Sequence, residues 1–220
     1  MSTADVGPVR QPTHRRSARV ASLVLVLVGF VGGAMLSRTP AGHDDWGTKD
    51  FIEYWAANQV AGGGGNPYDP AQIHAVEQAS GRMDSIPLMM WNPPWLLVLM
   101  RPVVQRPFER AAAIWMGVNV VMATVACLLI ASGYRRARLE AIDLIPATLA
   151  GVLSVPTALT IQLGQVSLVL LLGMALLYWS MRWRHDLLAG VALALLSIKP
   201  HLFLLVLVLV AIEIVRARRW

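Results

Sequence analysis

"AAAIWMGVNVVMATVACLLIAS", residues 111–132, contains no charged side chain, and Arg135, Arg136 and Arg138 follow it. An α-helix needs about 20 apolar residues to cross the hydrocarbon core of a bilayer. Cytoplasmic loops of membrane proteins carry an excess of lysine and arginine. The stretch therefore predicts a membrane-spanning helix whose carboxyl end lies in the cytoplasm.

Further apolar runs lie on both sides of this stretch. Residues 20–36 are long enough for a first span, whereas residues 94–104 are too short to cross and favour an interfacial or re-entrant helix. Residues 142–161 are expected to cross outward and residues 166–181 to return, with a tight external turn at 162–165. The returning run ends in arginines, which indicates a cytoplasmic end.

Two shorter apolar runs, 187–198 and 202–215, are separated by the tripeptide KPH at 199–201. Arginines lie at the far ends of both runs. A hairpin of two helices keeps both arginine clusters in the cytoplasm, whereas a single long helix would place one cluster outside. We therefore expect two helices that meet at Lys199, near the external surface.

The composition agrees with a membrane protein, because 56% of the residues are hydrophobic, only 15% are charged, and the mean hydropathy is positive. The net charge of +6 comes from short arginine clusters between apolar runs. No continuous basic face is formed, which argues against a nucleic-acid partner. The single cysteine, Cys127, excludes an intrachain disulfide. The expected fold class is an all-α polytopic membrane protein.

Charged residues divide the chain into a tail, a large loop and a bundle. Residues 1–19 are rich in Pro, Ser and Arg, which predicts a disordered basic tail in the cytoplasm. Residues 20–220 are expected to form one transmembrane domain, with a cleaved signal peptide as the alternative for its first run. Residues 37–90 hold seven of the thirteen acids and three lysines or arginines. The external loop, about 37–110, is therefore expected to face away from the cytoplasm.

This loop contains the segment TKDFIEYWAANQVAGGGGNPYDP, residues 48–70. On a helix, positions three or four apart share a face, so Asp50, Glu53 and Tyr54 are expected to be neighbours. Their helix is either the floor of a site or an interfacial helix that is capped by Thr48 and anchored by Trp55.

Four glycines and the motif NPYDP follow this helix. Glycine permits positive φ angles and each proline restrains the residue before it, so a helix end and a rigid turn are expected at 62–70. A flexible linker is the alternative. A phosphate-binding loop is excluded, because no strand precedes the glycines and no Gly-Lys-Ser/Thr follows them.

Lys199 and His201 are ionisable residues inside an apolar stretch. A lysine at the centre of a membrane helix costs about 2.5–3.5 kcal/mol on insertion scales. Lys199 is therefore expected either to bind a ligand or to extend its ammonium group toward the lipid headgroups. Asn119 and Gln162 are expected to form hydrogen bonds between helices.

Four polar segments fall on one predicted side of the membrane: the loop helix, WNPPW at 91–95, LGQ at 163–165 and KPH at 199–201. In this order, DFIEYWAANQVAGGGGNPYDP, WNPPW, LGQVSLVLLL and GVALALLSIKPH resemble glycosyltransferase family 87, the polyprenyl-phosphate-mannose-dependent mannosyltransferases of the GT-C superfamily. The resemblance runs from about residue 20 to the end of the chain. Family members generally continue for several more helices, so a truncated or partial member is expected.

The resemblance implies a GT-C-like helix bundle whose first external loop carries a catalytic aspartate, which is Asp50 here. It implies a polyprenyl-phosphate sugar as donor, a glycan or glycolipid as acceptor, transfer with inversion, and no metal or other cofactor. Lys199 and His201 would neutralise the donor phosphate. The other substrate-binding residues that it implies are Glu53, Tyr54, Asn66, Tyr68 and Gln165, with Trp91 or Trp95 stacking on a sugar ring.

Two other classes of function stay open on the sequence. A carrier or flippase for lipid-linked sugars would also need the carboxylate and the lysine, but transport requires access from both sides, and these polar groups lie at one face. A structural membrane protein without a ligand predicts that Asp50 and Lys199 can be replaced without consequence. The sequence favours an enzyme of the cell membrane with its amino terminus in the cytoplasm and its active site outside.

Overall fold

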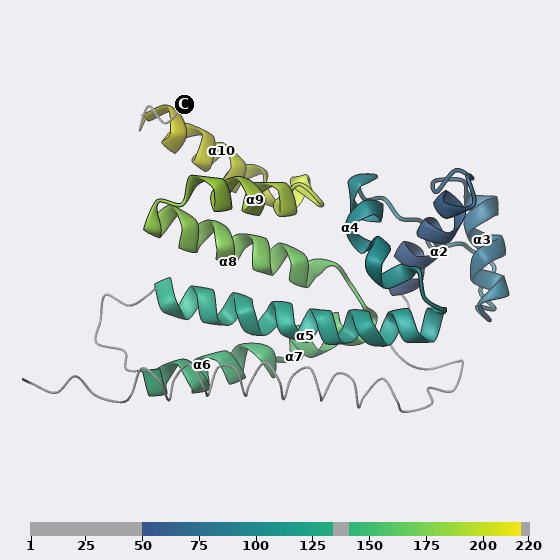
Figure 1. Cartoon of the computed structure of the whole chain (residues 1–220), viewed down its shortest axis with the longest axis horizontal. Coiled ribbons are helices and arrows are strands. Elements are labelled where there is room, and N and C mark those ends of the chain that lie inside the picture. The colour runs from purple at the N-terminus through teal and green to yellow at the C-terminus, as the bar shows by residue number, and fades with distance from the viewer. Residues whose placement is uncertain (1–49, 134–140, 217–220) are drawn as a thin grey trace, which may run out of the picture.

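The computed structural model describes residues 50–133 and 141–216, and all regular structure in these ranges is helical (Figure 1). The predicted tail at 1–19 and the first predicted span at 20–36 lie outside the described residues. The described helices are α2 (Phe51–Gly62), α3 (Pro70–Ala79), α4 (Trp95–Val104), α5 (Phe108–Gly133), α6 (Ala141–Val152), α7 (Val155–Leu163), α8 (Ser167–Trp183), α9 (Asp186–Leu196) and α10 (Pro200–Arg216).

α2, α3 and α4 form a small unit, the loop subdomain (residues 50–104), at one end of the long helices (Figure 1). Its core joins Phe51 and Tyr54 of α2 to Ile73 of α3 and Leu96 of α4, and none of these side chains is more than 1% exposed. α2 is apolar around most of its circumference because α3, α4 and α5 all contact it. The short helix expected at 94–104 is α4.

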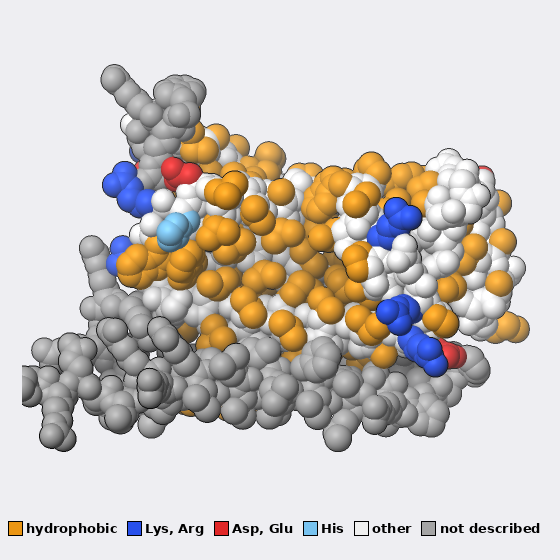
Figure 2. Space-filling view, in the orientation of Figure 1, with side chains coloured by type: hydrophobic (Ala, Val, Ile, Leu, Met, Phe, Trp, Pro, Cys, Tyr) orange, Lys and Arg blue, Asp and Glu red, His pale blue; other side chains and the backbone are white. Residues whose placement is uncertain are grey.

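The second unit is the helix bundle (residues 108–216), which is built around α5. α5 and α8 run in the same direction, because α6 and α7 return the chain between them (Figure 1). Of the described helices, α5 alone has the length and hydropathy to cross a membrane, and it contains the predicted span at 111–132. Hydrophobic side chains cover most of the visible bundle face (Figure 2).

The single helix expected at 142–161 is wrong, because the structure has two helices there, α6 and α7. The chain leaves the helical conformation at Ser154, whose backbone is extended, and Pro156 lies in the first turn of α7. A proline is favoured in the first turn of a helix, where its missing N–H leaves no hydrogen bond unmade. The Ser154 hydroxyl stabilises the break by donating to the carbonyl of Gly151 at 2.9 Å.

α9 and α10 are the two helices that the KPH break predicts. α9 ends at Leu196, a turn covers Ser197 to Lys199, and α10 then runs back along α9 (Figure 1). Val210 of α10 packs in one cluster with Leu177 of α8 and Leu196 of α9. The reversal brings the turn at Lys199 to the end of the bundle that carries the loop subdomain.

Candidate active site

Asp50 lies at the start of α2, where two contacts attach it to the turn between α7 and α8. Its backbone N–H donates to the carbonyl of Leu163 at 3.1 Å, and its carboxylate Oδ2 accepts from Nε2 of Gln165 at 2.6 Å. Asp50 occupies the capping position of α2, which the alternative of an interfacial helix assigned to Thr48. The Asp50 carboxylate makes no capping hydrogen bond, so it faces the Gln165 amide instead.

The Gln165 amide is held from both sides. While its Nε2 donates to Asp50, its Oε1 accepts from the Ser167 hydroxyl at 3.1 Å. These partners fix which end of the amide faces the carboxylate. The Asp50 carboxylate is therefore held in one orientation by a residue 115 positions later in the chain.

Gly164 makes this close approach of the two segments feasible. Its φ is +68°, in the left-handed region, and a Cβ on it would lie 2.6 Å from Cβ of Phe51. Its carbonyl also accepts from the Trp115 indole N–H at 2.7 Å. Only glycine satisfies both the backbone conformation and the packing at this position.

Glu53 and Tyr54 lie one turn further along α2. Tyr54 is 1% exposed, and its hydroxyl hydrogen-bonds the Glu53 carboxyl and the backbone of Val166. The pKa of Glu53 is raised to about 7, mainly by burial and to a smaller extent by the negative charge of Asp50. The hydrogen bond from Tyr54 and the positive charge of Lys199 act in the opposite direction on the Glu53 pKa. Glu53 thus changes its charge near neutral pH.

Burial also raises the pKa of the Tyr54 phenol above its ordinary value, and the Glu53 carboxyl adds to this shift. The phenol therefore stays protonated and can donate to Glu53 throughout the physiological pH range.

Lys199 approaches the same place from the turn between α9 and α10. The preceding residue, Ile198, is 2% exposed and belongs to the core cluster that contains Phe51 and Tyr54. Lys199 itself is half-buried, and its charge acts on Glu53. Both ion pairs in the described part of the chain involve Arg82, so Lys199 forms none there. Its ammonium group is available to an anionic ligand.

Asn66 and Tyr68 form the rigid turn that NPYDP predicts. Asn66 Oδ1 accepts from the backbone N–H of Tyr68 at 3.0 Å, and the Tyr68 hydroxyl donates to the carbonyl of Asn92 at 2.9 Å. Asp69 caps α3 by accepting from the N–H of Ala71 at 2.9 Å. A flexible linker is excluded. The proposed contacts of Asn66 and Tyr68 with a sugar stay predictions.

Trp91 and His201 are exposed, and Trp91 has 83% of its surface free. Trp95, at the start of α4, is partly buried against the core of the loop subdomain. Within residues 50–133 and 141–216, no hydrogen bond joins Trp91 or His201 to Asp50. Their roles in binding also stay predictions.

The sequence interpretation missed Glu77, which is fully buried in α3. Its carboxylate forms an ion pair with Arg82 and accepts from the backbone N–H of Leu88 at 3.0 Å. The available signal was the spacing of Glu77 four residues after the buried Ile73, which places both on one helix face. The ion pair attaches the segment after α3 to that helix.

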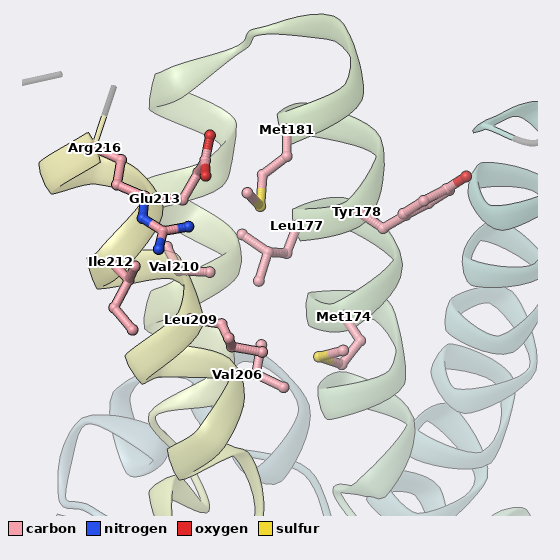
Figure 3. Close-up of a pocket in the computed structure, with 10 residues that line it drawn as sticks. All are labelled: Met174, Leu177, Tyr178, Met181, Val206, Leu209, Val210, Ile212, Glu213 and Arg216. Atoms are coloured by element: carbon pink, nitrogen blue, oxygen red, sulfur yellow. The ribbon is translucent and has the colours of Figure 1, made fainter. Parts of the chain in front are cut away.

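The apolar pocket between α8 and α10 lies away from these groups. Its volume is about 470 Å³, and methionine, leucine, valine and isoleucine side chains line it, with Glu213 and Arg216 at one end (Figure 3). It involves the later part of α10, from Val206 onward, whereas Lys199 precedes that helix. In the described residues, no group of three His, Cys, Asp or Glu side chains is arranged to hold a metal ion.

These features define a helical protein with a membrane-length helix and a carboxylate, amide and lysine at one end of its bundle. A family model described as glycosyltransferase family 87 matches residues 91–220, which is more than half of the chain. The protein belongs to glycosyltransferase family 87, as the sequence motifs indicated, and its substrates are a sugar donor and an acceptor. No curated protein and no solved structure gives a significant match.

Proposed function

We propose that the protein transfers a hexose, mannose in the first instance, from a polyprenyl-phosphate donor to a hydroxyl group of a glycan or glycolipid. The reaction takes place at the extracytoplasmic face of the cell membrane and inverts the anomeric configuration. The observation that carries this proposal is the 2.6 Å hydrogen bond from Gln165 to Asp50. Lys199 follows Ile198, which lies in the same core cluster as Phe51 and Val166, the neighbours of Asp50 and Gln165.

Asp50 acts as general base in this proposal. Its carboxylate accepts the proton of the acceptor hydroxyl while the hydroxyl oxygen bonds to the anomeric carbon. The bond between that carbon and the phosphate oxygen breaks, and its electron pair stays on the phosphate. Because the acceptor and the phosphate lie on opposite faces of the sugar, one displacement inverts the configuration. Gln165 fixes the direction in which the carboxylate points.

Lys199 stabilises the departing phosphate, whose negative charge increases as the bond breaks. His201, two residues later, lies on the first turn of α10 and supports this role if the donor extends along that helix. Glu53, Tyr54, Asn66, Tyr68 and Gln165 supply hydroxyl contacts, and Trp91 supplies a stacking surface. In this proposal the lysine takes the place of a metal ion as the positive partner of the phosphate.

The position of the site favours transfer over transport. Asp50, Gln165 and Lys199 come from three segments that meet at the end of the bundle carrying the loop subdomain. A carrier places its binding site near the bilayer midplane, with access from either side. The acidic composition of residues 37–90 supports an extracytoplasmic position for the loop subdomain.

The direct test uses membranes that contain the protein, a radiolabelled polyprenyl-phosphate hexose and extracted lipid and glycan acceptors. We expect label in the acceptor fraction and a 10²- to 10⁴-fold loss of transfer in Asp50→Asn, which keeps the shape but removes the base. Glu109→Gln, an exposed carboxylate at the start of α5, is the control. Movement of intact labelled donor across the membrane without acceptor labelling would favour a carrier.

A further inference from the structure

The pocket between α8 and α10 is apolar along most of its length and opens on the outside of the bundle (Figure 3). Leu209 and Ile212, which line it on α10, are 65% and 43% exposed. An apolar cavity of about 150 Å³ holds one benzene molecule, which has six carbon atoms. At the same ratio, a pocket of about 470 Å³ accommodates roughly 19 carbon atoms, the size of one long acyl chain.

The pocket lies in the half of the bundle away from the loop subdomain (Figure 1). α8 and α10 are each 17 residues long, or about 26 Å, and the pocket takes in the later part of both. The arginines at this end predict that it faces the cytoplasm.

An aromatic cluster marks the depth of this end in the membrane. Trp179 stacks on His185 with ring centroids 5.2 Å apart, and the Arg182 guanidinium lies 6.0 Å from the centroid of the Trp183 ring. Tryptophan is enriched where helices pass the lipid headgroups. The end of the pocket that Met181 lines therefore meets the headgroup region.

Two charged side chains of α10, Glu213 and Arg216, line the same end of the pocket. They are three positions apart and share one face of the helix, yet both ion pairs in the described part of the chain involve Arg82 instead. Figure 3 shows the Arg216 guanidinium turned back toward Val210, whereas the Glu213 carboxylate points toward the end of α8 that carries Met181. The positive group therefore lies nearer the apolar part of the pocket than the negative group does.

We propose that this pocket binds one phospholipid of the cytoplasmic leaflet, whose headgroup contains a phosphate and a primary ammonium group. The acyl chain fills the apolar part, Arg216 binds the phosphate, and the Glu213 carboxylate accepts hydrogen bonds from the ammonium group. The order of the two charges matches the lipid, because the phosphate stands between the acyl chains and the ammonium group. This role goes beyond the proposed transfer and does not depend on it.

The two charges favour this lipid over other ligands. An anionic lipid satisfies Arg216 but leaves its phosphate beside the Glu213 carboxylate with no cation to separate them, and like charges repel. A choline headgroup carries a positive charge but no N–H, so it donates no hydrogen bond to the carboxylate. The tail of the proposed sugar donor has no cation for Glu213, and its phosphate is assigned to Lys199, at the other end of α10.

The experiment is native mass spectrometry of the full chain, purified in detergent, stripped of lipid and titrated with dioleoyl lipids. The probes are phosphatidylethanolamine, phosphatidylglycerol and phosphatidylcholine, which share their acyl chains and differ only in the headgroup. We expect one phosphatidylethanolamine per chain, bound about three- to fivefold more tightly than the other two lipids.

Two charge variants assign the headgroup contacts. In Glu213→Gln the preference for phosphatidylethanolamine over phosphatidylglycerol should fall below about twofold, because the partner of the ammonium group is lost. Arg216→Gln should weaken all three lipids by about fivefold, because each contains a phosphate. The controls are Glu109→Gln and Arg110→Gln, at exposed positions near the start of α5, which should bind lipid like the wild type.

A pair of leucines on α10 tests the apolar part of the pocket. Leu209 lines the pocket, whereas Leu205, which is 78% exposed, does not. Leu209→Trp fills the space of the acyl chain and should remove the bound lipid. Leu205→Trp adds the same side chain one turn away and should leave the bound lipid in place.

Equal affinity of the wild type for the three headgroups, or an unchanged preference in Glu213→Gln, overturns the proposal. Displacement of phosphatidylethanolamine by an equal concentration of polyprenyl phosphate overturns it as well, and assigns the pocket to the tail of the sugar donor. A dimer that persists without lipid and dissociates in Leu209→Trp overturns it in favour of a second copy of the chain.

Discussion

The loop subdomain and the helix bundle are held together in different ways. In the loop subdomain, side chains form long-range polar contacts: Gln59 donates to the carbonyl of Val104 at 2.8 Å, Tyr68 to that of Asn92, and Arg82 pairs with Glu77. In the bundle, Asn119 of α5 is fully buried, and its amide has no hydrogen-bond partner in the described structure.

The surfaces of the helix bundle and the loop subdomain also differ. α10 exposes Leu204 and Leu205 at 61% and 78%, which is unfavourable in water but costs nothing against lipid. The loop subdomain instead satisfies its buried polar groups internally, as a unit in contact with water must. The two regions contribute different parts of the candidate site: the loop subdomain supplies Asp50 and Glu53, and turns of the bundle supply Gln165 and Lys199.

Gly164→Ala breaks the junction between the two regions and should have the largest effect. A left-handed residue with a Cβ costs about 1–2 kcal/mol, and overpacking against Phe51 adds about 1–3 kcal/mol. We expect a loss of about 3 kcal/mol in unfolding free energy and at least a hundredfold loss of transfer, because Gln165 no longer meets Asp50. Gly62→Ala, where an added Cβ meets no atom within 4 Å, is the control. Normal activity in Gly164→Ala would refute this account of the junction.

Glu77→Ala tests the polar framework of the loop subdomain. Removing Glu77 takes the buried partner from Arg82 and leaves the Leu88 N–H without its acceptor. Arg82 is partly exposed and also contacts Asp84, which moderates the effect. We expect the unfolding free energy to fall by about 2 kcal/mol, which should be seen as faster proteolysis between α3 and α4. Asp84→Asn, at an exposed carboxylate, should change stability by less than about 0.5 kcal/mol. Equal effects of the two variants would contradict the importance of burial.

Glu53→Gln tests the loop subdomain further, because its partly buried carboxyl should destabilise the fold at high pH. The folded-state pKa of about 7 lies above the ordinary value of 4.5, so the folded state retains its proton longer than the unfolded state. Stability therefore falls as the pH rises from 4.5 to 7 and is constant above. The variant should be more stable by about 1–3 kcal/mol at pH 8 and equal to the wild type below pH 4.5. Thermal unfolding in detergent between pH 4.5 and 8 measures this difference. A variant less stable than the wild type at pH 8 would contradict the prediction.

Asn119→Leu should have the smallest effect and the opposite sign to a normal core mutation. The Asn119 amide is buried without a hydrogen-bond partner among the described residues, so an apolar side chain of similar volume removes a desolvation cost. We expect a gain of about 1 kcal/mol with unchanged transfer, by thermal unfolding and activity assay. Destabilisation would show that the amide has a partner in the membrane.

The sequence predicted single elements better than the contacts between them. The apolar run at 111–132 determined α5, and KPH determined the turn before α10, since length, charge and proline act locally. The break before α7 was missed although Pro156 signalled it, because the apolar run continued across the proline. The predicted hydrogen bond of Asn119 to another helix is not formed within residues 50–133 and 141–216, where its buried amide has no partner.

The candidate site was predicted as a set of residues but not as an arrangement. Asp50, Gln165 and Lys199 were selected as polar residues on one side of the membrane. The structure joins Asp50 to Gln165 by a hydrogen bond and packs Ile198, which precedes Lys199, against the same core as Phe51 and Val166. This arrangement depends on the left-handed turn at Gly164 and on the burial of Ile198, which are tertiary features. The titration of Glu53 near neutral pH could not be predicted either, because it arises from desolvation by packed neighbours.

The separation of 115 residues between Asp50 and Gln165 also sets an order of events during biosynthesis. A ribosome that adds about 5–20 residues per second needs roughly 10 seconds to reach Gln165 after Asp50. The contacts of the loop subdomain are closer in sequence, such as the 24 residues between Tyr68 and Asn92, and can form during this interval. The loop subdomain should therefore fold first, with the Asp50 carboxylate still unoriented. A fault in the late turn at Gly164 would then leave a well-folded loop subdomain that passes cellular quality control without a working site.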